Sequence, residues 1–264
     1  MARHLLALFL ALAVGSVAGA ATFEQLTPGD GIAQIQFQHL AMNDAGQFVA
    51  VSNSQVYVGD ACSSGLTRVL ANERLGFLLE SSGTTAVDNT QTQVRLDLAM
   101  LGSRVAINAQ GDYVLASHTM LFVGNAKGGE PRKVYEEANT MIQQVAINDA
   151  GHYVALTRRN IVVGQIADAA AKKIVADAAD SFEGFSVAGN NGNWSAETGQ
   201  SRLALNARGQ FIAATGPAVF GGSVPGATAT KLYENAKVGF RHVKLASDGS
   251  FTAVSSRNVY RGKL

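Results

Sequence analysis

Five polar side chains recur at one position of a repeated pattern, seven residues before a turn glycine. They are His39, Arg104, Gln144, Arg202 and His242. Imidazole, guanidinium and amide groups all donate hydrogen bonds, and a guanidinium matches the two oxygens of a carboxylate or phosphate. If the repeats bring these five side chains together, the side chains predict a binding site for a small anionic or carbohydrate ligand.

Further donors are expected on the same rim. Two positions after each of the five residues the chain has four alanines and then Lys244, which leaves room in a central channel for one lysine. The turns after the second strand of three repeats contribute His118, Arg158, Arg159 and Arg257. Two long connections, residues 75–102 and 181–200, should rise over the rim with aromatic side chains (Phe77, Phe182, Phe185 and Trp194).

The repeat that positions these residues is clearest at Val145–Gly151, which reads Val-Ala-Ile-Asn-Asp-Ala-Gly. Close copies occupy residues 40–46, 105–111, 203–209 and 243–249. An aromatic residue follows each turn glycine by two positions, and a second glycine follows it by thirteen. The copies are separated by 65, 40, 58 and 40 residues, so the insertions lie in one kind of connection.

Each repeat predicts four strands. In the third copy they cover residues 143–147, 152–157, 160–164 and 172–176. The Asn-Asp-Ala-Gly turn predicts a hairpin, because Asn and Asp bind nearby backbone and Gly supplies a positive φ. The turn asparagines are therefore expected to shape turns and not to bind ligands. Five such repeats predict an all-β, five-bladed β-propeller.

The fifth repeat ends at Leu264 after three strands, so its blade needs a fourth. The segment Thr22–Leu26 lies before the first repeat, and the strand predicted at Thr230–Glu234 lies before the fifth. We expect this N-terminal strand to join the last blade and close the ring, which would cover an exposed sheet edge. Residues 21–264 then form a single domain with insertions at 75–102 and 181–200.

The Asn-x-x-Gly turn, preceded by Ala-Ile or Ala-Leu at Asn108, Asn148 and Asn206, resembles the short repeats of secreted bacterial propellers of the HAF-repeat kind. The resemblance covers all five repeats, although the His-Ala-Phe signature is absent. It implies a propeller fold and an exported bacterial protein, and it implies no activity. Trp-Asp dipeptides typical of WD-type propellers do not occur.

Residues 1–20 combine Arg3, an apolar run and small residues at Ala18 and Ala20, which predicts a signal peptide and a secreted or periplasmic protein. A membrane anchor is the alternative, but the run is shorter than the ~20 residues of a spanning helix. Loss of Arg3 would leave 20 basic and 20 acidic residues. Cys62 is the single cysteine, so no intramolecular disulfide can form.

Several functions are disfavoured by residue type. The innermost strands carry no Asp or Glu, so the paired carboxylates of a glycoside hydrolase would have to come from loop residues such as Asp97. Metal and cofactor motifs are absent, and a neutral chain is a poor partner for nucleic acid. Two alternatives to a ligand site remain: a solvated channel lining, and a protein-interaction scaffold without a small-molecule pocket.

A thermal-shift screen of small anions and acidic sugars tests the ligand prediction. A compound held by Arg104 and Arg202 should raise the melting temperature. At a concentration of 100 times its Kd it should increase the free energy of unfolding by about 2.7 kcal/mol. Arg104→Ala and Arg202→Ala should each remove the shift. If no compound stabilises the wild type, or the variants respond equally, the ligand prediction is wrong.

Overall fold

The computed structural model describes residues 37–52, 55–63, 65–71, 104–117, 119–138, 140, 142–157, 160–175, 202–214, 217–235, 237–255 and 258–264. Every regular element in these ranges is a β-strand. No helix in this described part of the chain is long and apolar enough to cross a membrane.

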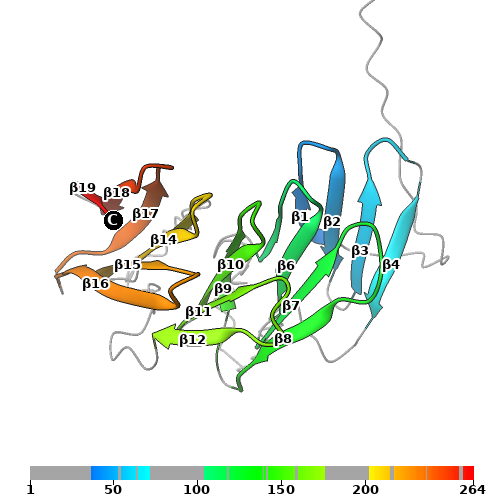
Figure 1. Cartoon of the computed structure of the whole chain (residues 1–264), viewed down its shortest axis with the longest axis horizontal. Helices are drawn as coiled ribbons and strands as arrows, with labels where there is room; N and C mark the ends of the chain where they lie inside the picture. Colours follow the sequence, from blue (N-terminus) through cyan, green and yellow to red (C-terminus); the bar gives the residue numbers. More distant parts are fainter. Residues whose placement is uncertain are drawn as a thin grey trace, which may run out of the picture.

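The described strands form five antiparallel sheets, shown in Figure 1. The first sheet holds β1 (Phe37–Met42), β2 (Gln47–Ser52), β3 (Gln55–Asp60) and β4 (Leu66–Ala71). The second holds β5 (Val105–Ile107), β6 (Asp112–Ala116), β7 (Met120–Asn125) and β8 (Arg132–Glu136). The third holds β9 (Ile142–Ile147), β10 (His152–Thr157), β11 (Ile161–Gln165) and β12 (Lys172–Val175). The fourth holds β13 (Leu203–Leu205), β14 (Gln210–Ala214), β15 (Ala218–Ser223) and β16 (Thr228–Glu234), and the fifth holds β17 (Phe240–Leu245), β18 (Ser250–Ser255) and β19 (Val259–Lys263).

Strand order in every sheet follows the chain, so each sheet is an up-and-down meander. The repeat pattern predicted this arrangement well. In the third sheet the predicted strand at residues 152–157 is β10, and the other three predicted strands differ from the observed ones by a single residue at one or both ends.

The thirteen-residue spacing between the two glycines of a repeat has a steric cause. The second glycine lies directly across from the aromatic residue on the neighbouring strand, as in the pairs Phe48 with Gly59 and Phe211 with Gly222. A Cβ atom on Gly59 or Gly222 would lie 2.5 Å from the ring Cζ of that aromatic. The ring therefore occupies the space that a side chain would need, and both residue types are required together.

The turn glycines have the positive φ that the sequence predicted, from 77° at Gly151 to 88° at Gly249. Each preceding asparagine holds its turn with Oδ1, as Asn148 Oδ1 accepts from His152 N at 3.0 Å. The side-chain amides do more than shape turns, because each Nδ2 donates to a backbone carbonyl of the following sheet. The four bonds run from Asn43 to Asn108 O (2.9 Å), Asn108 to Asn148 O (3.2 Å), Asn148 to Asn206 O (3.0 Å) and Asn206 to Ala246 O (3.1 Å).

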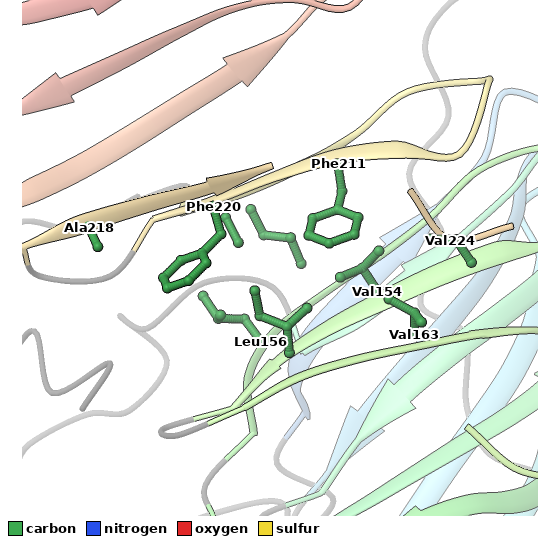
Figure 2. Packing of buried hydrophobic residues seen from close by; sticks show 10 residues of the cluster. Val154, Leu156, Val163, Phe211, Ala218, Phe220 and Val224 are labelled. Carbon is green, nitrogen blue, oxygen red and sulfur yellow. The ribbon is translucent and has the colours of Figure 1, made fainter. Parts of the chain in front are cut away.

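Each sheet packs one face against the next sheet along the chain. Between the third and fourth sheets, Val154 and Leu156 of β10 lie against Phe211 of β14 and Phe220 of β15, all of them buried (Figure 2). Equivalent clusters join the other neighbouring sheets. Four-stranded meanders stacked face to face are the blades of a β-propeller, so the chain is an all-β propeller repeat protein.

The first and fifth sheets lie at opposite ends of an arc in Figure 1. Leu40 on β1 is 67% exposed, whereas its equivalents in the other sheets are buried (Val105, Val145, Leu203 and Val243). Val259 on β19 is 71% exposed. The segment expected to close the ring, Thr22–Leu26, lies outside the described residues, so closure and the blade number of a closed ring remain predictions.

Replacing one ladder asparagine should destabilise the fold. Asn148→Ala removes the bonds to Asn206 O and from His152 N and leaves a buried carbonyl and amide without these partners. Urea unfolding should show a loss of about 1–3 kcal/mol. The matched control is Ala246→Asn, at the same position of the fifth sheet. Its amide has no following sheet among the described residues, so its effect should stay within about 0.5 kcal/mol. Equal effects would mean that the bonds between sheets contribute nothing.

Candidate functional site

The five predicted rim residues occupy equivalent places at the start of the inner strands. Gln144 on β9 lies across from Leu156, and His39 and His242 have the same register on β1 and β17. Arg104 and Arg202 directly precede β5 and β13, where their carbonyls accept from the second strand at 2.8 Å. Lys244 is exposed on β17, while Arg158 and Arg257 lie outside the described residues, as do both insertions.

Two of the five residues, Arg104 and Gln144, are buried. Arg104 is 2% exposed, and burial lowers its pKa to about 10. Gln144 is also buried, and its Oε1 accepts from Arg202 N at 3.0 Å. Burial and the charge of Arg241 lower the pKa of Arg202. Gln144 is buried because the inner strand begins where the next sheet packs. Its hydrogen bond with Arg202 N therefore joins the third and fourth sheets.

Ligand binding by these residues stays a prediction. His39 on β1 and His242 on β17 lie at opposite ends of the arc (Figure 1), so the described part of the chain does not bring them together. Within the described ranges no group of three His, Cys, Asp or Glu side chains could hold a metal ion.

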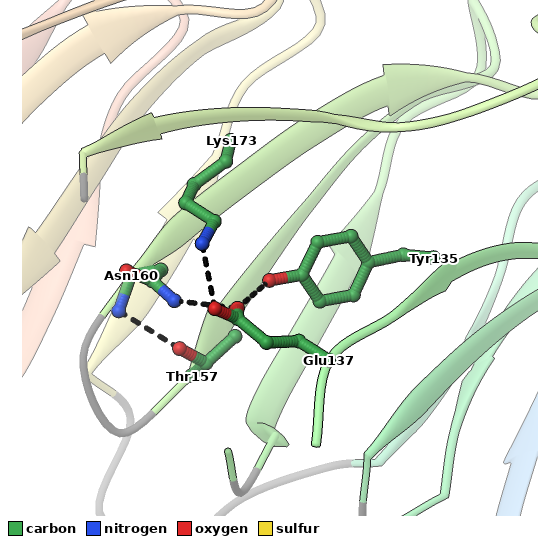
Figure 3. A network of polar contacts seen from close by, with 5 residues as sticks. All are labelled: Tyr135, Glu137, Thr157, Asn160 and Lys173. Atoms are coloured by element: carbon green, nitrogen blue, oxygen red, sulfur yellow. Dashed lines mark hydrogen bonds and ion pairs between the residues drawn. The ribbon is translucent and has the colours of Figure 1, made fainter. Parts of the chain in front are cut away.

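A polar network between the second and third sheets was not predicted from the sequence. Glu137, directly after β8, accepts from Asn160 Nδ2 at 2.8 Å and from the Tyr135 hydroxyl, and it pairs with Lys173 Nζ at 2.6 Å (Figure 3). Asn160 is fixed in turn by its backbone N, which donates to Thr157 Oγ1 at 2.8 Å. Lys173 lies on β12, so the network joins the outer strands of two sheets.

Electrostatics of this network favour an ionised carboxylate. Partial burial alone would raise the pKa of Glu137, but hydrogen bonds from Lys173, Tyr135 and Asn160 and the charge of Lys173 outweigh it, so the pKa lies below its usual value. Burial, together with Glu137, raises the pKa of the Tyr135 hydroxyl. Since three donors already hold one acid, the arrangement suits a structural tie and not acid–base catalysis.

A groove of about 310 Å³ lies between the fourth and fifth sheets. Its lining includes Leu232 and Tyr233 of β16, Phe240 of β17 and Tyr260 of β19. We refer to it as the β19 groove. Leu232 and Tyr233 are 41% and 37% exposed, while the matching residues Val134 and Tyr135 of β8 are buried or half-buried.

Three aromatic rings form one wall of the β19 groove. The ring centres of Tyr233 and Phe240 are 5.7 Å apart, and Tyr260 lies 5.2 Å from each of them. At the interface between the second and third sheets the equivalents of Phe240 and Tyr260 are the aliphatic residues Ile142 and Val162, and in the fourth sheet the equivalent of Tyr260 is Phe220. An aromatic wall that is partly open to solvent is typical of protein-binding surfaces.

The β19 groove exists because the fifth sheet has three strands in the described part of the chain, while the other four sheets have four. The outer strand of one sheet normally covers the outer strand of the preceding sheet, as Ala171 N before β12 donates to Val134 O of β8 at 2.9 Å. No described strand does this for β16.

Backbone groups of β19 point away from β18, at an edge where no other described strand pairs. Ser255 N donates to Asn258 O and Leu264 N donates to Gly249 O, each at 2.9 Å. Because antiparallel pairs alternate, the peptide groups of Val259, Arg261 and Lys263 then face away from β18. Along the described chain β19 therefore presents an open sheet edge beside an apolar groove.

Comparison with solved structures finds distant similarity to β-propeller domains. No protein-family model matches the chain, and no curated protein matches it. The structure of "YCF48 bound to D1 peptide" has a TM-score of 0.48 at 10% identity, covering 93% of this chain and 70% of that one. The β-propeller domain of Cps50 (Swd1) from Myceliophteria thermophila has a TM-score of 0.49 at 9% identity. The WD40 β-propeller domain of Doa1 has a TM-score of 0.49 at 10% identity. Each of the last two alignments covers 87% of this chain and 65% of the other.

The Glu137 network predicts a pH dependence of stability. Because the folded pKa is depressed, its stabilisation is complete above the unfolded value of about 4.3 and is lost as the pH falls through the folded pKa. The difference in unfolding free energy between wild type and Glu137→Gln should therefore be largest at pH 7 and shrink below about pH 4. Urea titrations from pH 3 to 7 measure it. The control is Lys133→Met, which removes the exposed ion pair between Lys133 and Glu136 within one sheet. If the difference in unfolding free energy between wild type and Glu137→Gln does not depend on pH, the ionic interaction of Glu137 does not stabilise the fold.

Proposed function

We propose that this chain is a protein-interaction scaffold that binds an extended polypeptide strand in the β19 groove. The observation that carries the proposal is the open edge of β19 beside the aromatic wall of Tyr233, Phe240 and Tyr260. A bound strand would gain backbone hydrogen bonds along the edge and would bury apolar side chains in the groove. This combination is the physical basis of strand addition to exposed sheet edges.

The groove favours this function over small-ligand binding. An apolar groove of this size beside three outward peptide groups suits a polypeptide backbone, which supplies a donor and an acceptor at alternate positions. Among the predicted ligand residues, Arg104 and Gln144 are buried, and Gln144 already binds the next sheet.

The ring-closing prediction places a segment of the same chain in the same groove. Thr22–Leu26 would then be the fourth strand of the fifth blade, and five blades would close. An external partner strand and this N-terminal strand cannot occupy the groove together. Peptide-binding experiments on the full chain therefore distinguish the two occupants. Export through a leader at residues 1–20, to the cell exterior or the periplasm, belongs to this proposal as well and would make the partner an exported polypeptide.

Blocking the β19 edge should abolish binding. Arg261→Pro removes an outward N–H and leaves the bonds between β18 and β19 in place, since proline is tolerated where the N–H of an edge strand faces solvent. The probe is a displayed library of random decapeptides, selected on the full chain. Selected peptides should bind Arg261→Pro at least about tenfold more weakly, a loss of about 1.4 kcal/mol.

The matched control is Arg261→Ala, which keeps the N–H and should bind the selected peptides as the wild type does. Equal melting temperatures of the two variants exclude a folding defect. If the library yields no binders, or its binders ignore Arg261→Pro, the proposal fails. It also fails if peptides bind only after Phe23→Pro and Gln25→Pro are introduced together, because the N-terminal segment would then fill the groove.

A further inference from the structure

Two of the donors that hold Glu137 are repeated in the β19 groove. In the Glu137 network they are the Tyr135 hydroxyl and Asn160 Nδ2 (Figure 3). Their counterparts at the interface between the fourth and fifth sheets are Tyr233 and Asn258, which stand at the same positions of the repeat. The register of β16 against β15 also matches that of β8 against β7. The groove therefore has a hydroxyl and an amide where the other interface binds a carboxylate.

Asn258 is anchored in the same way as Asn160. The backbone N of Asn160 donates to Thr157 Oγ1 at 2.8 Å, and the backbone N of Asn258 donates to Ser255 Oγ at 3.0 Å. The side chain of Asn258 reaches the aromatic wall, since its Nδ2 lies 3.4 Å from the Tyr260 hydroxyl oxygen. The turn before β19 therefore places an amide donor beside the wall.

Within the described groove no acid takes the place of Glu137. The fourth sheet has Asn235 at that position of the repeat. Asn235 Oδ1 accepts from Lys237 N at 3.0 Å, and its Nδ2 lies 3.4 Å from the Tyr233 hydroxyl oxygen. The side chain thus turns its acceptor to the backbone and its donor to the groove. Since the hydroxyls of Tyr233 and Tyr260 accept these long amide bonds, each keeps its own proton to donate.

The charged residues that line the described part of the groove are both cations, Arg261 and Lys263. Because side chains alternate along a strand and Tyr260 faces the groove, these two side chains point to the outer face of β19. Lys263 Nζ lies 3.7 Å from Asp248 Oδ2, which does not line the groove. Surface charges act over about 10 Å at moderate salt. The edge therefore attracts an anion, and the neutral donors of the groove are left to bind it.

The register of β12 indicates where a partner strand would bring such an anion. Lys173, which reaches the Glu137 carboxylate, lies across from Val162 of β11. The counterpart of Val162 in the fifth sheet is Tyr260. A strand that pairs antiparallel with β19 therefore directs the residue across from Tyr260 into the groove, and the next residue on either side points to the outer face.

A second residue of the partner strand also faces the groove. It lies across from Gly262, two places before the residue that lies across from Tyr260. At this position the first and fourth sheets have apolar residues, Leu66 and Ala229, each across from the second glycine of its own repeat. Gly262 leaves the ring of Phe251 uncovered on this side, because the ring occupies the place of its missing side chain. An apolar residue of the partner would cover that ring.

We infer that the partner of the β19 groove is an extended segment with an apolar residue and, two places later, a glutamate that lies across from Tyr260. The inference rests on the proposed function and specifies the chemistry of the partner. The hydroxyls of Tyr233 and Tyr260 and the amides of Asn235 and Asn258 donate to the carboxylate, and hydrogen bonds to an ionised acceptor are stronger than neutral ones. Glutamate is favoured over aspartate because its longer side chain better matches the lysine that fills this position in β12.

The probe is a fluorescein-labelled octapeptide, Thr-Thr-Leu-Thr-Glu-Thr-Thr-Thr, titrated into the full chain and followed by anisotropy. Its Leu and Glu face the groove together, and Thr fills the other places because it favours extended strands and carries no charge. We expect saturable binding that Arg261→Pro abolishes and Arg261→Ala retains. Replacing the peptide Glu by Gln should weaken binding about tenfold, because the hydrogen bonds to a charged acceptor are lost. Replacing it by Lys should weaken binding further, since the groove then presents only donors to a donor.

Removal of the two hydroxyls isolates their role. The double variant Tyr233→Phe and Tyr260→Phe keeps the rings of the aromatic wall, so the Gln peptide should bind it as it binds the wild type. The Glu peptide should lose its advantage over the Gln peptide. The matched control is Tyr135→Phe, which removes the equivalent hydroxyl between the second and third sheets and should leave the preference for Glu unchanged.

The outcomes separate this inference from the proposed function. If the Glu, Gln and Lys peptides bind equally and Arg261→Pro abolishes all three, the groove binds strands and the preference for an acid is wrong. If none of the peptides binds, or Arg261→Pro leaves binding unchanged, strand binding in the β19 groove is itself wrong. A preference for Glu that survives in the double variant overturns the role of the hydroxyls. Binding that appears only after Glu24→Gln overturns the external partner, because the chain's own N-terminal segment would then supply the acid.

Discussion

The described sheets of this protein depend on their neighbours along the chain. One face of each meander is apolar and becomes buried only when the next sheet packs on it, as β10 packs on β14. The asparagine side-chain amides also link consecutive sheets. Each donates to a backbone carbonyl of the following sheet, and among the described residues none donates to the preceding sheet. Apolar burial supplies most of the free energy of this stacking, and the amide bonds fix the distance and order of the sheets.

The ends of the arc show what happens when this dependence is not met. Leu40 has the residue type of a buried position and lies open to solvent, because no described sheet precedes the first. The fifth sheet differs from the others where it faces outward, with Thr252 and Arg261 in place of residues that are apolar or glycine elsewhere. Polar outer faces are what terminal repeats need for solubility. The outer surface of the fifth sheet is therefore adapted to water, and the surface on its other side carries the β19 groove.

Most of the fold could be predicted from the sequence, because its determinants are local. A turn glycine fixes φ, and the aromatic residue two positions later must lie across from a glycine, so spacing alone identifies the second and third strands. The exported leader, the ring closure and the roles of the insertions concern residues outside the described ranges and remain predictions.

The candidate site was harder to predict, for reasons that differ between its parts. Alternation along β9 identifies the face on which Gln144 lies, but burial depends on how closely the next sheet approaches, and no single repeat contains that information. The Glu137 network joins residues 36 positions apart through two sheets. The aromatic wall combines Tyr233, Phe240 and Tyr260 from three strands, and it borders a groove because the fifth sheet has three strands in the described part of the chain.

The forward direction of the amide bonds limits how such an array can change in length. A duplicated interior repeat would bring both a carbonyl that accepts from the sheet before it and an amide that donates to the sheet after it, so the chain of bonds would stay continuous. A repeat appended after the fifth would face Ala246, which has a carbonyl but no side-chain amide to offer. Growth by recombination is therefore easier within the array than at its C-terminal end.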